Sequence, residues 1–480
     1  MGQLTAFGLL ASAATALALV LPHDNITTSP PSPDPISTAY YAAGYLPPPT
    51  YDPWYSPPSG WESTVPGTPL RIRQPAYPSI NVRGCKDTLQ ILYRSSDTHG
   101  NASWSVVTVF RPNDTYFNSL PPLNTKNFAG RLKGRGVVSY QVPSDSVAPD
   151  AAPSNLLQGQ EPYGEMRDLL MRGWIVAVPD YEGPRASYCA GAQAGYATLD
   201  AIRAVRAVAG THVGIDPESS RYALWGYSGG GFAAGFAMEL MGRYAPDLIG
   251  KLVGAAVGGP SPNLTTVAQA MNKKDTAGLV VASLVGVVDQ WPEAREYLRS
   301  RLKAEGTYNA TGFLKIEKMS GVEALMAYKD QDVYDYFVGG KSDIWGSESN
   351  GIIQAVVDKD AVMGVHEAPP KEVPVFVYKA AKDEMSAVEE TDVLVESYCK
   401  GGARVLYHRN HEGGHNDELW AGRLRTMDFL RTVLDGWTGA NMTIPDVGKC
   451  ITEDVKVPLD VTCLLPEWWW GGAPRPAECG

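Results

Sequence analysis

The sequence predicts an α/β protein with a mostly parallel β-sheet, helices on both faces and an inserted, mainly helical cap. Short apolar runs alternate with helical segments over residues 137–259 and again over 373–437, and a Gly-x-Ser-x-Gly turn lies between one strand and one helix. Strands that alternate with helices imply right-handed crossovers and a parallel sheet covered on both sides.

The expected strands are short runs rich in Val, Ile, Leu and aromatic residues, and the expected helices have apolar residues at helical spacing. Two of these helices end at glycines, Gly173 and Gly210. In chain order we expect strands at 91–96, 105–112 and 137–143, a helix at 164–173, a strand from 174, a helix at 195–210, a strand from 221, a helix at 232–246, and a strand at 251–259; after the interruption come a strand at 373–381, a helix around 392–399, a strand at 403–410 and a helix at 418–437.

The alternation breaks between residues 261 and 364, which we interpret as a cap inserted into a core made of residues 67–260 and 365–450, followed by a tail at 451–480. The insertion contains the uncharged run Gly278–Val288, which is too short for the roughly 20 residues that span a bilayer. The run is expected to be either a buried helix or a surface that lies against lipid.

The N-terminus has the outline of a secretory signal peptide at residues 1–21, although a basic segment is missing and a buried helix is the alternative. Residues 22–66 are dense in proline and predict an extended linker or a wrap over the core. Six glycosylation sequons accompany this signal and favour a glycosylated, secreted protein. They begin at Asn25, Asn101, Asn113, Asn263, Asn309 and Asn441.

Six cysteines in an exported chain predict disulfide bonds, with 15 possible connectivities. They are Cys85, Cys189, Cys399, Cys450, Cys463 and Cys479, and none forms a C-x-x-C pair. The chain has 41 basic and 52 acidic residues, a net charge of −11. This charge argues against nucleic acid or anionic lipid as a partner. We expect no cofactor and no metal.

The turn Gly226-Tyr227-Ser228-Gly229-Gly230 predicts a nucleophilic serine. Such a turn is so tight that a Cβ atom at Gly226 or Gly230 would collide with neighbouring backbone. The serine hydroxyl then projects above the sheet edge, and the amide of Gly229 at the helix N-terminus faces a developing oxyanion.

A serine needs a histidine to accept its proton and a carboxylate to hold that histidine. In α/β-hydrolases the acid and then the histidine follow the serine, each beyond a strand. Asp383 is the first acid after the strand at 373–381, with Glu384 and Asp392 as alternatives. Beyond the next strand, His415 is favoured over His411, because Gly413 and Gly414 provide a flexible loop that brings its ring over the sheet edge; His408 lies within the strand and is expected to be structural.

Residues 411–415 also read H-E-x-x-H, the pattern of zinc metallopeptidases. That chemistry needs both histidines on one face of a helix. Two central glycines, each costing about 1 kcal/mol relative to alanine, disfavour a helix there. We therefore keep the zinc peptidase as a remote alternative, which a chelator assay would test.

These segments resemble the fungal secretory lipase family, an α/β-hydrolase group that includes Candida antarctica lipase A. The similarity runs from about Asp52 to Cys450. It rests on the segments DPWYSPPSGWESTVPGTPLRIR, VVSYQVPSDS, VAVPDYEGP, GYATLDAIRAV, LWGYSGGG, VYKAAKDEMSA and HEGGHNDELWAG, which follow one another in this order.

The resemblance implies a triad of Ser228, Asp383 and His415, and an oxyanion hole in which Asp145 assists the amide of Gly229. A carboxyl group that donates a hydrogen bond must be protonated, so its pKa has to be raised by burial; the alternative for Asp145 is an acid that caps a loop turn. The resemblance also implies an acyl-binding tunnel in the cap, to which the 278–288 run would belong unless it is an ordinary buried helix.

The chain departs from the family pattern at two places. A cysteine expected near residues 150–153 is absent, which puts the family's disulfide pattern in doubt, although a Cys399–Cys450 pair remains compatible with it. The tail with Trp468, Trp469 and Trp470 has no counterpart that we can align, and its role stays open.

Together these features predict a secreted carboxylic-ester hydrolase that works through an acyl-serine intermediate. The expected substrate is a lipid ester such as triacylglycerol, met at a lipid–water interface. The alternative is an esterase for small acylated secondary metabolites, and a non-enzymatic surface protein is the remaining one.

Overall fold

The computed structural model describes residues 37–38, 40, 45–75, 84–113, 136–158, 163–346, 351–437 and 442–459. The predicted signal peptide, the sequons at Asn25 and Asn441, two of the cysteines (Cys463 and Cys479) and the three adjacent tryptophans lie outside these residues.

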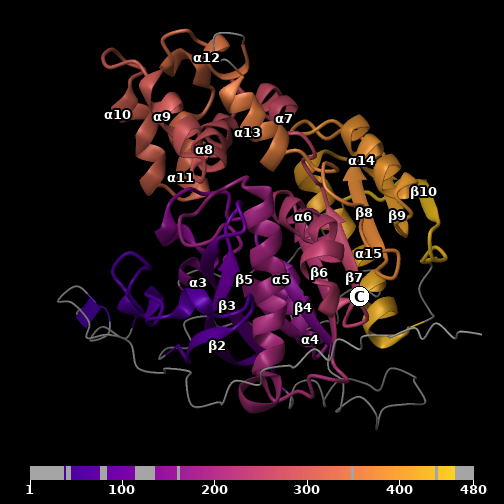
Figure 1. Ribbon diagram of the computed structural model, residues 1–480. Coiled ribbons are helices and arrows are strands. Elements are labelled where there is room, and N and C mark those ends of the chain that lie inside the picture. The colour runs from indigo at the N-terminus through magenta and orange to yellow at the C-terminus, as the bar shows by residue number, and fades with distance from the viewer. Residues whose placement is uncertain are drawn as a thin grey trace, which may run out of the picture.

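Within the described residues a ten-stranded mixed sheet runs through the centre of the molecule (Figure 1). Its order is β1-β2-β3-β5-β4-β6-β7-β8-β9-β10. The pairs β1·β2, β2·β3 and β3·β5 are antiparallel, and every neighbouring pair from β5 to β10 is parallel. The strands are β1 (Pro69–Arg73), β2 (Cys85–Ser96), β3 (Ala102–Pro112), β4 (Gly136–Gln141), β5 (Ile175–Pro179), β6 (Arg221–Tyr227), β7 (Leu252–Gly258), β8 (Val375–Ala380), β9 (Val405–Asn410) and β10 (Cys450–Val455).

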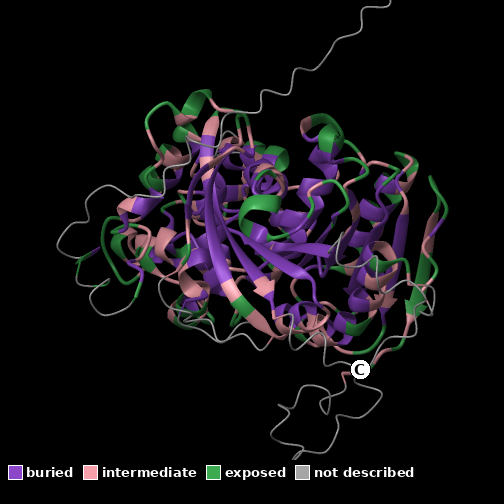
Figure 2. Cartoon of the chain, turned by 90° about the horizontal axis from the view of Figure 1, so that it is seen from below, coloured by how far each residue is buried: buried purple, intermediate pink, exposed green. Residues whose placement is uncertain are grey.

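Helices cover both faces of this sheet, so its central strands are buried on both sides (Figure 2). Helices α5 (Gly191–Ala207), α6 (Gly229–Tyr244) and α14 (Val388–Lys400) pack on one face, and α4 (Gly164–Met171) and α15 (His415–Asp435) pack on the other. Short α3 (Pro153–Leu156) lies beside β3 and β5. This arrangement confirms the predicted mostly parallel α/β fold.

A layer of helices lies above the sheet, and in the chain it is inserted between the paired strands β7 and β8 (Figure 1). It occupies the segment predicted to be inserted. It consists of α7 (Leu264–Met271), α8 (Ala277–Val288), α9 (Pro292–Ser300), α10 (Ala310–Leu314), α11 (Gly321–Tyr328), α12 (Ser342–Trp345) and α13 (Ile352–Asp360). The run at 278–288 forms most of α8, which is buried along nearly its whole length. It is therefore a core helix of this layer rather than an exposed surface. No helix in the described part of the chain has the length and apolarity needed to cross a membrane.

Strand β10 lies in the segment that we expected to be a tail. It pairs in parallel with β9, from Cys450 beside Val405 to Val455 beside Asn410, so the sheet continues beyond residue 450. The strand was not predicted because its sequence, CITEDV, is polar. A polar sequence is suitable here because β10 lies at the sheet edge and is largely exposed. A Cys399–Cys450 disulfide, the pair that remained reasonable from the sequence, joins it to α14, whereas Cys85 and Cys189 form no disulfide with another described residue.

The described part of the N-terminal extension packs over the outer strands. Trp54 and Tyr55 are buried in a cluster with Leu92 and Val106, and the Arg73 guanidinium lies 4.0 Å from the centre of the Trp54 ring. This part of the extension is therefore a wrap over the core rather than a free linker.

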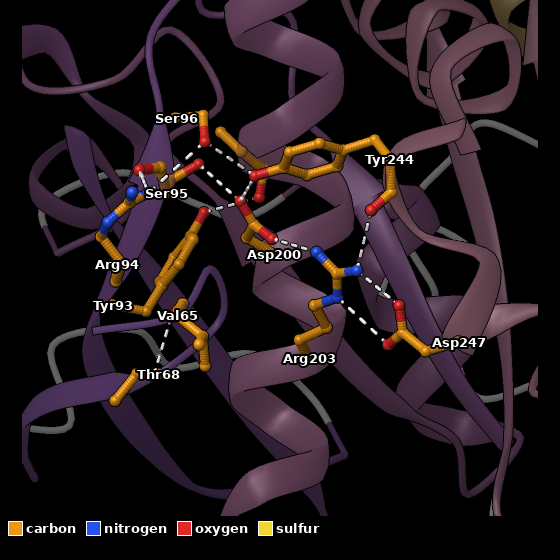
Figure 3. A network of polar contacts seen from close by, with 11 residues as sticks. Val65, Thr68, Tyr93, Arg94, Ser95, Ser96, Asp200, Arg203, Tyr244 and Asp247 are labelled. Atoms are coloured by element: carbon orange, nitrogen blue, oxygen red, sulfur yellow. Dashed lines mark hydrogen bonds and ion pairs between the residues drawn. The ribbon is translucent and has the colours of Figure 1, made fainter. Parts of the chain in front are cut away.

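A buried polar network ties helix α5 to its neighbours (Figure 3). Asp200 accepts hydrogen bonds from Ser95 at the end of β2 (2.9 Å) and from Tyr244 at the end of α6 (2.7 Å). Arg203 pairs with Asp200 at 2.9 Å and also with Asp247. Buried charges are tolerated when they are paired in this way, so the network fixes α5 and α6 on the sheet face that supports the serine turn.

Candidate active site

The turn between β6 and α6 holds Ser228 in a strained conformation, with φ 55° and ψ −120°. A Cβ atom at Gly226 would lie 2.0 Å from the carbonyl oxygen of Gly230, and one at Gly230 would lie 2.0 Å from that of Gln141. The predicted need for glycine at both positions is confirmed. Positive φ costs a serine about 1–3 kcal/mol, so the packed surroundings must impose this conformation.

The structure brings Ser228, His415 and Asp383 into one chain of hydrogen bonds. The Nε2 atom of His415 lies 3.0 Å from Ser228 Oγ, and its Nδ1 lies 2.6 Å from Asp383 Oδ2. Ser228 is partly exposed, whereas the side chains of His415 and Asp383 are buried. This geometry suits a hydroxyl that gives its proton to an imidazole held by a carboxylate.

The Asp383 carboxylate is fixed through both oxygens. Oδ1 accepts hydrogen bonds from the amides of Met385 and Ser386, each at 2.9 Å, and Oδ2 also pairs with Lys379 at 2.9 Å. Burial by itself would raise the pKa of Asp383, but the hydrogen bonds and charges of His415 and Lys379 outweigh it and hold that pKa well below its usual range. Asp383 is therefore a carboxylate at neutral pH.

His415 begins helix α15 and does not lie in the flexible loop that we expected. Its amide donates to Glu384 Oε2 at 2.9 Å, its carbonyl accepts from the Tyr227 hydroxyl at 2.6 Å, and the Asp417 carboxylate accepts from the amide of Gly414 at 3.1 Å. The contacts of the two amides satisfy donors at the helix N-terminus, so the helix starts three residues earlier than its apolar pattern suggests.

The rejected candidate acids have other partners. Glu384 binds the backbone of His415 rather than its ring, and Asp392 on α14 pairs with Arg409 at 3.4 Å. Of the three acids that the sequence offered, Asp383 is the one that contacts the imidazole.

The zinc-peptidase arrangement predicted as a remote alternative is wrong. His411 precedes helix α15 and its Nε2 lies 2.8 Å from Asp454 on β10, so it shares no helix face with His415. His408 lies in β9 as expected; burial, with the nearby charge of Arg425, lowers the pKa of His408 to about 4.

Asp145 lies beside Gly229, as the family resemblance implied. Its Oδ1 is so near that a Cβ atom at Gly229 would lie only 2.2 Å from it. This oxygen is buried and has no hydrogen-bond partner among the described residues. Burial raises the pKa of Asp145 to about 6, although Tyr188 and the charge of His415 act in the opposite direction. A neutral carboxyl group here is able to donate a hydrogen bond toward the space above Ser228.

Sequence reasoning missed Lys379 as part of this site, and it considered Glu384 only as an alternative triad acid and not as the acceptor for the amide of His415. Lys379 is four residues before Asp383, and that spacing was the signal available in the sequence. Both residues gain their role from contacts between separate segments, which a strand pattern does not reveal.

Comparison with known proteins shows which family this chain resembles. Residues 157–441 match the secretory lipase family. A trichothecene C-3 esterase from Fusarium sporotrichioides is 40% identical over 428 residues, which cover 88% of this chain and 90% of that protein.

The chain belongs to the secretory lipase family. Another relative is lipase A of Arthroderma benhamiae, 35% identical over 82% of this chain and 81% of that protein. The structure of Candida antarctica lipase A is similar to this fold with a TM-score of 0.67, at 23% identity over 85% of this chain and 90% of that one. The predicted family, α/β-hydrolase fold and enzyme class are thereby confirmed: this secretory lipase family member is a carboxylic-ester hydrolase.

Proposed function

We propose that the chain hydrolyses esters through an acyl-serine intermediate on Ser228. The single observation that supports this most is the hydrogen-bonded chain from Ser228 Oγ through the His415 imidazole to the Asp383 carboxylate. Ser228 Oγ attacks the ester carbonyl carbon while its proton passes to Nε2 of His415. Asp383 stabilises the imidazolium that forms.

The resulting oxyanion is bound by the amide of Gly229 and by the protonated carboxyl of Asp145. As the tetrahedral intermediate collapses, His415 gives its proton to the leaving alcohol oxygen. Water then attacks the acyl-serine, passes its proton to His415, and the released acid leaves Ser228 Oγ–H restored. Each of these steps uses groups of this chain alone.

For the substrate we favour an ester of a small fungal secondary metabolite. The support is the 40% identity to a trichothecene C-3 esterase and the 34% identity to a probable trichothecene esterase of Stachybotrys chartarum. The first expectation from the sequence was triacylglycerol, and it is retained as the second candidate.

One structural observation favours that second candidate. Val322 and Met326, one turn apart on α11, are 68% and 77% exposed. The segment that precedes this helix is bonded to the Asp145 loop, because Ser146 Oγ donates to the carbonyl of Met319 at 2.7 Å. An exposed apolar face this near the oxyanion loop suits a lipid–water interface. The helices α7 to α13 would then act as the cap over the acyl group.

We also propose that the protein is secreted and glycosylated. The family is described as secretory, and the signal-like residues 1–21 agree with export. Asn101 is exposed in the hairpin between β2 and β3 and is therefore accessible to glycosylation.

The test is a substrate panel run on wild type and on Ser228→Ala. We expect a fluorophosphonate probe to label wild type at Ser228 and the variant not at all, with kcat on every ester at least about 10⁴-fold lower in the variant. Faster hydrolysis of acetylated trichothecene-type alcohols than of emulsified triolein supports the first substrate class, and the reverse supports the second. Full activity in Ser228→Ala would refute the mechanism.

A further inference from the structure

Lys379 is a buried cation next to the triad acid. It lies on β8, and its side chain has 0% exposure. Its Nζ lies 2.9 Å from Asp383 Oδ2 and donates to the carbonyl oxygen of Pro260 at 2.8 Å. An unpaired ammonium in the interior costs several kcal/mol or loses its proton, and these two partners offset that cost.

The contact falls on the oxygen that matters for the reaction. Oδ1 of Asp383 is already held by the amides of Met385 and Ser386, whereas Oδ2 is shared by Lys379 and the Nδ1 of His415. The two amides suffice to orient the carboxylate. What Lys379 adds is a positive charge in contact with Oδ2, the same oxygen that contacts the imidazole of His415.

The other charged groups around this pair do not replace Lys379. Among the ion pairs of the described residues, Asp383 takes part in those with Lys379 and His415. The remaining acids nearby are Glu384 on the same loop, Glu390 on α14, Glu418 on α15 and Asp145 on the loop after β4. Among the described partners of these acids, the cation Arg425 is paired with Glu418. Lys382 lies on the same loop as Asp383, but it is exposed.

We propose that Lys379 is a positioning residue of the reaction, and this proposal rests on the proposed function. The Lys379 ammonium holds Asp383 by the oxygen that faces His415, and it extends the activity of the enzyme into mildly acidic solution. A carboxylate stabilises a neighbouring imidazolium, and a cation on that carboxylate weakens the effect. The ammonium of Lys379 therefore reduces the stabilisation that the Asp383 carboxylate gives to the imidazolium form of the catalytic base.

The properties of Asp145 explain why activity in mildly acidic solution is useful to the proposed reaction. Its carboxyl group is a hydrogen-bond donor only while protonated, and its pKa is about 6. The donor form of Asp145 is thus present in mildly acidic solution, which is the range in which we expect the charge of Lys379 to matter for the reaction.

The test compares Lys379→Met and Lys379→Gln with wild type, because methionine keeps most of the unbranched apolar stem of lysine without its charge and glutamine keeps a hydrogen-bond donor. Lys382→Met is the matched control: it removes the same charge from an exposed lysine three residues further on. For each protein, kcat/KM for a soluble ester is measured from pH 4 to 9, and a fluorophosphonate probe gives the concentration of active sites.

We expect the acid limb of the pH profile to move upward by about one pH unit in both Lys379 variants and to stay in place in Lys382→Met. Unchanged acid limbs in labelled, active Lys379 variants would overturn the proposal. So would failure of both neutral variants to fold, since Lys379 would then serve the fold. If the probe does not label Ser228 in wild type, the proposed function itself fails, which is a separate outcome.

Discussion

The carboxylate of Glu384 accepts a hydrogen bond from the backbone amide of His415, with 2.9 Å between Oε2 and N. Two consecutive acids thus hold two parts of one histidine: Asp383 binds the imidazole and Glu384 binds the backbone at the first turn of α15. An anion at a helix N-terminus is stabilised by the free amides and by the helix dipole. The loop after β8 therefore fixes both the orientation of the ring and its height above the sheet.

Glu384→Ala is expected to lower kcat about tenfold, because a base that is free to shift loses alignment with Ser228. Asp383→Asn should lower kcat far more, on the order of 10⁴-fold, because it removes the negative charge that stabilises the imidazolium. Glu384→Gln keeps an acceptor for the amide and is the control. Steady-state kinetics on one soluble ester test this; equal losses in the alanine and glutamine variants would show that the hydrogen bond to His415 is not the cause.

Asp145 gives a prediction with a definite pH sign. Its pKa of about 6 means that the donor form is present below that pH and is lost as the pH rises through it, so kcat/KM should fall on the alkaline side. Asp145→Asn keeps a donor at every pH and should flatten this limb. Asp145→Ala removes the donor and should lower kcat/KM about 10²- to 10³-fold.

The same group links pH to stability. The pKa of Asp145 is raised from 3.8 to about 6 in the folded protein. The protonated Asp145 carboxyl group therefore makes its full contribution to the free energy of unfolding below pH 4, and this contribution is lost as the pH rises through 6. Asp145→Asn should therefore stabilise the protein above pH 6, by roughly 1 to 3 kcal/mol, and have little effect near pH 4. Urea unfolding at pH 4 and pH 8 measures both values, and an equal effect at the two pH values would argue against a buried proton.

The Cys399–Cys450 disulfide anchors the edge strand β10 to α14 and closes a segment of 51 residues. Chain entropy alone predicts that removing it costs about 4 kcal/mol. The double change Cys399→Ser with Cys450→Ser should lower the urea midpoint accordingly, while Cys85→Ser, at a cysteine without a disulfide, should change it little. A small loss in the double variant would mean that β10 is held by its hydrogen bonds to β9.

Features of the site that depend on contacts between residues close in sequence could be predicted, and features that depend on contacts between distant segments could not. The collision at Gly226 is with Gly230 of the same turn, and the motif by itself anticipates the glycine at 230 although its collision is with Gln141 of the neighbouring strand β4. The start of α15 at His415 could not be predicted, because the acceptor of its amide comes from another loop. Lys379 resembled a solvent-facing residue of an apolar strand, and its burial depends on Asp383 and on Pro260.

Edge strand β10 could not be predicted for a different reason, which is its composition. Its charged side chains Glu453 and Asp454 interact with His408 and Arg409 of β9, so a strand that belongs to the sheet has the composition of a surface tail. Backbone pairing at an edge needs no apolar pattern, and periodicity therefore carries no signal for it.

The exposed face of α11 separates the two substrate classes. Replacing Val322 and Met326 by aspartate puts two charges where a lipid surface would lie, and burial of such side chains is worth about 1.5–3 kcal/mol each. If the enzyme works at an interface, the double variant should lose tenfold or more of its activity on emulsified triolein and keep its activity on soluble p-nitrophenyl acetate. Val393→Asp, at a valine of α14 that is 67% exposed, is the matched control. Parallel losses on both substrates would mean that α11 supports the oxyanion loop rather than an interface, and unchanged activity on both would favour the small-metabolite esterase.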